Sequence, residues 1–377
     1  MTAFILGPKV YMGGSNVSTV LAGVKKVLVV TDKFMNDSGK VKYVTDYLDS
    51  INAQYEVFSD VFAEPDVETV KAGLAVMASL QPDCVVAFGG GSPVDAAKAI
   101  KFFWEQQEGA SKHRLVVIPT TSGTGSEVSS VAVIGDKEKG VKYPLVSDSL
   151  LADSAILDAS LVVSVPPRVT ADTGIDALGH AIEAYVSINH TDFSDAMAEK
   201  SIELICEHLP TAYKTSDDME ARQAVHNAAC MAGVAFNNAG LGLTHAMGHP
   251  LGATFDLPHG RAIALLLPYI MNYNAGCSTI LTETAKRYAA LARLLYLDVS
   301  GTRQSALSFI RSVRFLIDKI GIPTRIKDTG INKEDFENAL ESMATDALAD
   351  ATLASTPVPA TKQQIIDLYR SAYDGKY

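Results

Sequence analysis

The sequence has few of the cysteines and aromatic residues that mark small secreted scaffolds. Its 377 residues include four cysteines and one tryptophan. The cysteines form no CxxC pair, and they lie far apart in apolar or helical segments, at Cys84, Cys206, Cys230 and Cys277. This distribution predicts buried free thiols in a reducing cytosol rather than a disulfide framework.

Long hydrophobic runs are also missing. The longest apolar run, residues 262–271, has about half the length that a membrane-spanning helix needs, and Pro268 is expected to break it. The first residues, MTAFILGPKVYMGG, lack the basic region, long apolar stretch and cleavage site of a secretory signal. We therefore expect no membrane span and a cytoplasmic location.

Clustered positive charge is absent as well. The chain carries 32 Lys and Arg against 43 Asp and Glu, a formal net charge of −11. Nucleic acid phosphates would be repelled, so a small-molecule partner is favoured. The remaining composition, 47% hydrophobic and 20% charged, is typical of a globular protein. A chain of this length is expected to form two domains or one large one, and two domains are favoured.

The first part of the chain repeats a buried strand, a turn and an amphipathic helix. The strand runs are KVLVVTD at 26–32, DCVVAFGGGS at 83–92 and RLVVIPTTSGTGSE at 114–127. Such alternation indicates a parallel sheet covered by helices, with ligands bound at the carboxyl ends of the strands. The sequence predicts an α/β, Rossmann-like dinucleotide-binding domain over residues 1–165.

The pattern changes after Pro166 and Pro167. The following segments are rich in Ala, Leu and Glu and contain no strand runs. We predict an all-α domain over residues 166–377, carrying a metal site for the reasons given below.

Two glycine loops follow neighbouring strand runs. Gly89, Gly90, Gly91 and Ser92 open a helix, where glycines and free amide N–H groups suit a pyrophosphate. A tight turn without a ligand is equally compatible, because the motif is not G-x-G-x-x-G. The second loop, at 120–127, surrounds two glycines with hydroxyl groups. Two such loops together favour a dinucleotide site.

Asp32 ends the first of these strands. Its carboxylate could accept hydrogen bonds from a ribose diol and repel a 2′-phosphate, which favours NAD over NADP. The alternative is an N-cap of the next helix, and the sequence leaves both roles open.

Histidines and one aspartate are paired at helical spacing. Asp176 and His180 are four residues apart, as are His245 and His249, and His259 follows a Gly- and Pro-containing stretch expected to leave the helix and return. A simple ion pair is the alternative for the first pair. An N/O set without thiolate suits Fe(II) or Zn(II). Four of the five would be ligands, and His249 would remain beside the metal as a free proton carrier.

Four ordered motifs resemble the group III, iron-dependent alcohol dehydrogenase family over nearly the whole chain. They are GGGSPVDAAKA, PTTSGTGSEV, DALGHAIEAY and GLTHAMGHPLGATFDLPHG. Two further segments, KGVKYPLVSDSLLADSAILD and ALADATLASTPVPAT, are most similar to the 1-propanol dehydrogenases of propanediol utilisation and the ethanol dehydrogenase branch near them.

The resemblance implies a role for each candidate residue. The metal would be held by Asp176, His180, His245 and His259. NAD would lie across the cleft between the domains, with its pyrophosphate on residues 89–92 and Asp32 on the adenine ribose. Phe236 would line the substrate channel. The rest of the cofactor would contact Thr120, Thr121, Thr124, Ser129 and Lys142.

The expected activity is metal-dependent interconversion of a short-chain primary alcohol and its aldehyde with NAD(H), and 1-propanol and propanal are the favoured pair. Alternatives in the family are an ethanol or a 1,2- or 1,3-diol (lactaldehyde-type) dehydrogenase. A metal-dependent hydrolase or lyase, or a non-catalytic nucleotide-binding scaffold, would leave part of the motif set unexplained. We also expect a homodimer or higher homo-oligomer. The resemblance to the propanediol-utilisation enzymes also suggests that this enzyme is encapsulated with other enzymes in a bacterial microcompartment.

Overall fold

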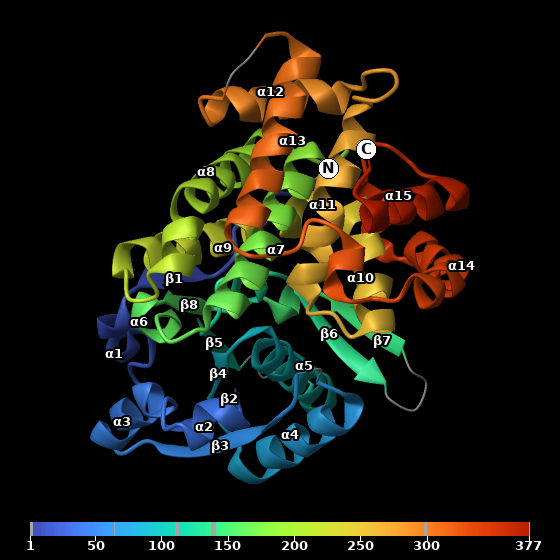
Figure 1. Ribbon diagram of the computed structural model, residues 1–377. Helices are drawn as coiled ribbons and strands as arrows, with labels where there is room; N and C mark the ends of the chain where they lie inside the picture. Colours follow the sequence, from blue (N-terminus) through green and yellow to red (C-terminus); the bar gives the residue numbers. More distant parts are fainter. Residues whose placement is uncertain (1–2, 64, 110–112, 137–140, 298–299, 377) are drawn as a thin grey trace. The chain divides into compact units, whose positions relative to one another are not determined.

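The chain folds into two compact units (Figure 1). The first comprises Ile5–Ser164, and the second comprises Val165–Tyr377 together with Met1–Phe4. The computed structural model describes residues 3–63, 65–109, 113–136, 141–297 and 300–376.

The first unit contains a parallel sheet with the strand order β1-β8-β5-β4-β2-β3. Its central strands are almost continuously apolar and buried, as expected for a sheet covered on both faces. The α/β class predicted from the sequence is confirmed. The strands are β1 (Lys9–Met12), β2 (Lys26–Asp32), β3 (Gln54–Val61), β4 (Cys84–Gly89), β5 (Arg114–Pro119) and β8 (Ser154–Leu157).

Alternate residues of the central strands enter two separate cores. Leu28 and Val30 of β2 pack in one core with Ile100 of α5, and Val27 and Val29 pack in the other with Leu48 of α3. The helices of this unit are α1 (Val17–Val20), α2 (Lys33–Asp37), α3 (Lys42–Ser50), α4 (Val67–Leu80), α5 (Gly91–Glu108) and α6 (Ala159–Val162), with 3-10 turns η1 (Gly14–Asn16), η2 (Ser126–Val128) and η3 (Asp148–Leu150).

A two-stranded antiparallel ribbon interrupts the strand and helix alternation. It is formed by β6 (Val131–Asp136) and β7 (Val141–Val146). The sequence patterns did not predict it, because β6 buries fewer residues than the central strands β2, β4 and β5 and carries a weaker apolar signal.

Every regular element described after Val165 is helical, which confirms the predicted all-α second part. The helices are α7 (Pro167–Val186), α8 (Asp192–Lys214), α9 (Met219–Ala239), α10 (Leu243–Phe255), α11 (His259–Ala275), α12 (Glu283–Leu294), α13 (Thr302–Lys319), α14 (Lys333–Ala349) and α15 (Lys362–Asp374), with η4 (Ile326–Thr329) and η5 (Ala351–Ser355). Helix α7 is buried without a break from Gly174 to Val186. It therefore forms the centre of this unit.

Two prolines do not end helices as the sequence suggested. Helix α10 continues through Pro250, and α11 continues through Pro268. Each proline removes one backbone N–H, and the apolar side chains around it are buried in a shared core that offsets this loss. The expected excursion between His249 and His259 is consequently only a short turn over 256–258, where Asp256 adopts a φ of 51°.

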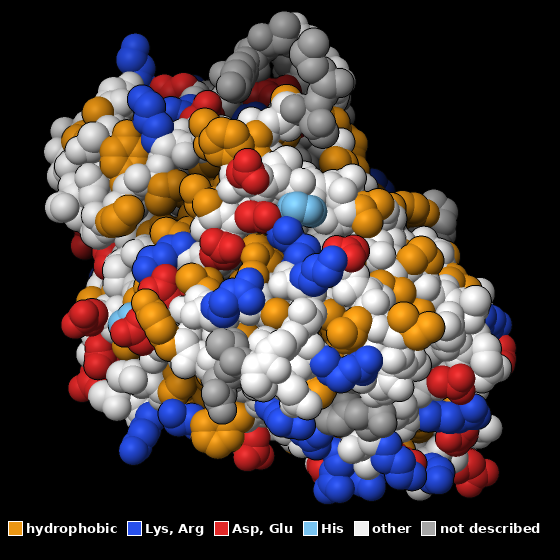
Figure 2. Space-filling view, turned by 90° about the horizontal axis from the view of Figure 1, so that it is seen from above, with side chains coloured by type: hydrophobic (Ala, Val, Ile, Leu, Met, Phe, Trp, Pro, Cys, Tyr) orange, Lys and Arg blue, Asp and Glu red, His pale blue; other side chains and the backbone are white. Residues whose placement is uncertain are grey.

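The described helices include none that is both long and apolar enough to cross a membrane. All four cysteines are free thiols. On the face shown in Figure 2, Lys and Arg side chains are interspersed with Asp and Glu side chains, and apolar side chains lie between them. This mixture is typical of a solvated surface.

Candidate metal and dinucleotide sites

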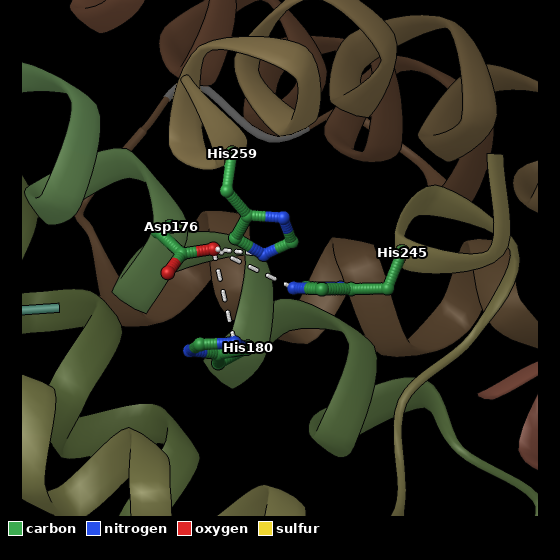
Figure 3. A group of neighbouring side chains, drawn as sticks. All are labelled: Asp176, His180, His245 and His259. Atoms are coloured by element: carbon green, nitrogen blue, oxygen red, sulfur yellow. Dashed lines mark ion pairs between the residues drawn. The ribbon is translucent and has the colours of Figure 1, made fainter. Parts of the chain in front are cut away.

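Three helices of the second unit bring four candidate ligands together. Asp176 and His180 lie one turn apart on α7, His245 lies on α10, and His259 is the first residue of α11. Their ligand atoms all lie within 4.8 Å of one another (Figure 3).

One carboxylate oxygen is the centre of this group. Asp176 Oδ1 lies 3.8 Å from His180 Nε2, 3.6 Å from His245 Nε2 and 3.2 Å from His259 Nε2. Ligands held at about 2.0–2.2 Å around one tetrahedral ion are roughly 3.3–3.6 Å apart. The separations are therefore those of atoms that share a metal ion.

Two of these atoms are buried without a hydrogen bond. Asp176 Oδ1 and His245 Nε2 have no hydrogen-bond partner among the described residues. Buried polar atoms are nearly always satisfied, because an unpaired one keeps its full desolvation cost. A cation between them would satisfy both, so the residues fit a divalent metal.

The charges favour the same occupant. Burial would raise the pKa of Asp176, but the histidines around it together hold that pKa well below its usual range. Burial lowers the pKa of His180 to about 4, so its imidazole is neutral and offers a lone pair at pH 7. Burial also disfavours a charge on His245, but Glu183 outweighs it and raises that pKa to about 9. The carboxylates of Asp176 and Glu183 thus stabilise positive charge in this site.

Glu183 is a part of this site that the sequence analysis missed. Its carboxylate lies 2.5 Å from His245 Nδ1, with the side chain 4% exposed. The spacing contained a signal, because Glu183 follows Asp176 by seven residues and His180 by three, on one helix face.

His249 lies beside the four residues. Its Nδ1 is 2.6 Å from Asp350 Oδ2, its ring stacks on that of His259, and its side chain is 42% exposed. Burial opposes the charge of Asp350, but the hydrogen bond from His249 lowers that pKa to about 2. Asp350 was also missed, because it is 101 residues away in sequence and no local pattern links the two. Phe236, predicted to line a substrate channel, packs on His180 with ring centroids 4.6 Å apart.

A glycine permits the close approach of α11 to α7. A Cβ atom on Gly260 would lie 1.9 Å from the carbonyl oxygen of Asp172. Arg261 Nε donates to Asp172 Oδ1 at 2.9 Å and ties the two helices together at this point. The start of α11 is therefore fixed where His259 can reach Asp176.

The predicted dinucleotide residues lie in the first unit, at the carboxyl ends of three neighbouring strands. Asp32 ends β2, residues 89–92 run from the last residue of β4 into the start of α5, and the loop at 120–127 follows β5. Thr120 N donates to Gly89 O at 2.8 Å and joins the two loops.

The glycines of the first loop allow tight packing. A Cβ on Gly89 would lie 2.6 Å from Pro93 Cγ, and one on Gly91 would lie 2.9 Å from Thr124 Cγ2. A Cβ on Gly90 would lie 3.4 Å from the Thr121 side chain. Thr120 Oγ1 is buried and makes no hydrogen bond within the described structure, so it can serve a ligand.

Several predicted contacts also have structural partners. Asp32 Oδ1 accepts a hydrogen bond from Met35 N at 2.9 Å and caps α2, so the N-cap alternative is present in the structure. Ser92 Oγ donates to Ala63 O at 2.6 Å. Ser129 is buried and accepts hydrogen bonds from Lys98 Nζ. Lys142 lies in β7, but its side chain is outside the described residues.

Lys98 is a further residue that the sequence analysis missed. Its ammonium is fully buried on α5 and donates to Ser129 O at 2.7 Å and to Val131 O at 2.9 Å. It also contacts Ser126 Oγ at 3.3 Å, and Ser126 donates to Asp95 Oδ1 at 2.6 Å. Burial lowers the pKa of Lys98 to about 8. This network holds the end of the second loop.

Comparisons with known proteins agree with the geometry. Residues 8–159 match the family model of iron-containing alcohol dehydrogenases, and residues 170–373 match the C-terminal model of the same family.

Individual relatives extend over the whole chain. The chain is 42% identical to the 1-propanol dehydrogenase PduQ of Salmonella typhimurium over 98% of this chain and 99% of that protein. It is 37% identical to an NADPH-dependent butanol dehydrogenase of Clostridium saccharobutylicum, covering 100% of this chain and 99% of that one. A crystal structure of a 1,3-propanediol oxidoreductase is 33% identical, with a TM-score of 0.91 over 99% of this chain and 100% of that one. The chain therefore belongs to the iron-containing alcohol dehydrogenase family and is an alcohol oxidoreductase.

Proposed function

We propose that this enzyme interconverts 1-propanol and propanal with NAD(H) at an iron(II) centre held by Asp176, His180, His245 and His259. The observation that carries the proposal is the convergence of three imidazole Nε2 atoms on Asp176 Oδ1. The similarity to a 1-propanol dehydrogenase supports the choice of alcohol.

The two units would have separate roles in this reaction. When bound, the cation would lower the pKa of the alcohol hydroxyl and polarise the aldehyde oxygen, and the nicotinamide would exchange the hydride. The second unit supplies the ligand set and Phe236, which we propose faces the substrate because it packs on His180. The first unit supplies the dinucleotide loops. We therefore infer a division into an NAD-binding and a catalytic domain.

The proton would move through His249. Since Asp350 is a carboxylate, the proton of His249 lies on Nδ1 and the Nε2 lone pair is open for a proton from the substrate side. The partly exposed ring can then pass a proton to solvent.

The cofactor would be bound by residues of the first unit. We propose that the pyrophosphate lies on Gly89, Gly90, Gly91 and Ser92 at the start of α5, where the first amide N–H groups of an 18-residue helix favour an anion. Thr120, Thr121, Thr124 and Lys142 would contact the remainder. For Ser129, whose hydroxyl is engaged by Lys98, we propose that it contacts the cofactor while linking the loop to that lysine.

Asp32 would select NAD over NADP. One of its oxygens caps α2, and the other, Oδ2, faces Gly89 at the loop. A carboxylate there would accept a ribose diol and repel a 2′-phosphate. The similarity to an NADPH-dependent butanol dehydrogenase makes this selectivity a point to measure.

The metal and the setting are part of the proposal. Iron is favoured by the family, and Zn(II) accepts the same ligands and ranks above Fe(II) in intrinsic affinity. Free thiols at all four cysteines support a cytoplasmic location. We propose a homo-oligomer with β1, an edge strand of the sheet, as a contact. Residence in a microcompartment would follow from the resemblance to propanediol-utilising enzymes and is tested by cell fractionation.

The experiment is a kinetic comparison of propanal, acetaldehyde and lactaldehyde with NADH and NADPH, on protein prepared anaerobically with its metal measured. We expect the highest kcat/KM for propanal with NADH. A preference for acetaldehyde or lactaldehyde would show that this aldehyde, and not propanal, is the substrate. A preference for NADPH would refute the proposed role of Asp32. Hydrolysis without cofactor would favour the metal-dependent hydrolase instead.

A further inference from the structure

One buried carboxylate contacts both a candidate ligand and the backbone that carries it. Glu183 Oε1 accepts a hydrogen bond from Thr244 N at 2.6 Å. Glu183 Oε2 accepts from Gly242 N at 3.1 Å and lies 2.5 Å from His245 Nδ1. All of these groups are buried. The carboxylate thus faces N–H groups on both of its oxygens.

This arrangement determines which nitrogen of His245 carries the proton. An ionised carboxylate can only accept hydrogen bonds, so the nitrogen facing Glu183 must be the protonated one. When a cation displaces the second proton of this ring, the other nitrogen, Nε2, offers its lone pair, and it lies 3.6 Å from Asp176 Oδ1. The partner of one ring nitrogen commonly decides in this way how the other binds a metal.

The same carboxylate fixes the first turn of α10. Gly242 is the N-cap of this helix, and its amide and that of Thr244 would otherwise lack acceptors. A Cβ on Gly242 would lie 3.1 Å from Glu183 Oε1, so glycine allows the backbone to come this close. The backbone and the ring of His245 are therefore held by one side chain.

His180 shows that not every candidate ligand has such support. Its Nδ1 is buried and makes no hydrogen bond to any described residue. Its ring is held by packing, with Phe236 and His245 at centroid distances of 4.6 and 4.7 Å.

We propose that Glu183 is a positioning residue that presents His245 to the metal through Nε2. The inference deepens the proposed function and rests on its assignment of His245 as a ligand. Glu183 does not touch the metal or the substrate, and its effect is transmitted through the orientation and tautomer of His245.

Glu183→Gln tests the inference, because glutamine has one acceptor oxygen where glutamate has two. Its NH₂ group would face either the amide of Thr244 or both the amide of Gly242 and the Nδ1–H of His245, and all three are donors. We expect the Zn(II) affinity of the stripped full-length chain, measured by chelator competition, to fall about 10- to 100-fold. Glu183→Asp keeps both carboxylate oxygens on a side chain that is one methylene shorter. Its Zn(II) affinity should lie between that of the parent and that of Glu183→Gln.

Asp350→Asn is the matched control. It makes the same carboxylate-to-amide change beside the Nδ1 of His249, which lies outside the ligand set. It also removes one negative charge near the site. We expect it to weaken Zn(II) binding much less than Glu183→Gln, which separates positioning from a general loss of charge.

Nitrogen NMR of histidine-labelled, Zn(II)-loaded protein reports the tautomer directly. The parent should show a metal-bound Nε2 and a protonated Nδ1 on His245, and the Nδ1–H signal should shift or vanish in Glu183→Gln. Thermal unfolding of the metal-free variants shows whether the fold is retained. If Glu183→Gln does not fold, Glu183→Asp carries the same comparison.

Parental Zn(II) affinity and an unchanged Nδ1–H signal in both Glu183 variants would overturn the inference. A parent chain that binds no Zn(II), or a His245→Ala variant with full affinity, would instead overturn the proposed metal site and the inference with it. These failures are distinct, because only the first leaves the metal site intact.

Discussion

Among the individual residues, three histidines of the site face the carboxylate of Asp176, and a fourth, His249, does not. Three imidazoles point Nε2 at Asp176, whereas His249 is held by Asp350 from the other side of its ring. Ligand and proton carrier can therefore be tested independently.

Changing His249 to Ala should slow turnover and leave the metal in place. We expect kcat to fall at least about tenfold, because proton transfer loses its positioned group, while metal content by elemental analysis stays at the parental level. Asp350→Asn should produce a smaller decrease in kcat. Loss of metal from His249→Ala would show that it is a ligand.

A second prediction at this scale concerns Lys98. Lys98→Met retains the apolar stem and removes the donors that hold Ser129 and Val131. We expect the dissociation constant for NADH, followed by fluorescence titration, to rise at least about tenfold, since hydrogen bonds from charged groups contribute more than neutral ones.

Lys101→Met is the control for this prediction. Lys101 is also buried on α5, but it contacts Glu105 and the carbonyl of Ser149 rather than the loop end. NADH affinity close to that of the parent is expected for this variant. An equal loss of NADH affinity in both variants would indicate a general effect of replacing a buried lysine.

The sequence predicted interactions at helical spacing better than those across the fold. The pairs Asp176 and His180, and His245 and His249, could be placed on common faces because one helical turn brings such residues together. Asp350 reaches His249 only through the packing of α14 and η5 against α10. Glu183 carried a periodic signal, but its partners lie on another helix.

At the element scale, the start of α11 depends on a contact between backbones. Gly260→Ala would place a methyl group against the carbonyl of Asp172 and push α11 away from α7. We expect a loss of about 1–3 kcal/mol in the free energy of unfolding, together with weaker Zn(II) binding, because His259 moves with the helix.

Gly252→Ala provides the comparison for this prediction. It lies within α10, and its nearest added contact is 3.4 Å from Leu257 O, an ordinary separation. It should retain the parental metal affinity and gain slightly in helix stability. If Gly260→Ala retains both stability and affinity, the close approach does not position His259.

Element boundaries were harder to predict than element types. Pro250 and Pro268 have the usual sequence signature of a helix end, but burial of their neighbours in a common core keeps both helices continuous. The β6 and β7 ribbon escaped detection for a related reason, since its strands are only partly buried and their apolar pattern is weak. Tertiary packing decided both cases.

At the scale of the whole molecule, the two groups of candidate residues belong to different compact units. The loops and Asp32 lie within Ile5–Ser164, and the four clustered ligands lie within Val165–Tyr377. Metal removal should therefore abolish turnover and leave NADH binding in place. Fluorescence titration of chelated protein tests this, and NADH binding that requires metal would contradict it.

We propose that one metal ion per chain supports NADH-dependent aldehyde reduction. The most direct test adds Fe(II) anaerobically to metal-free protein in known ratios and follows NADH absorbance with propanal. We expect the rate to rise from near zero and to reach its plateau at one bound ion per chain. Full activity without metal, or no NADH oxidation with any short aldehyde at full loading, would contradict it.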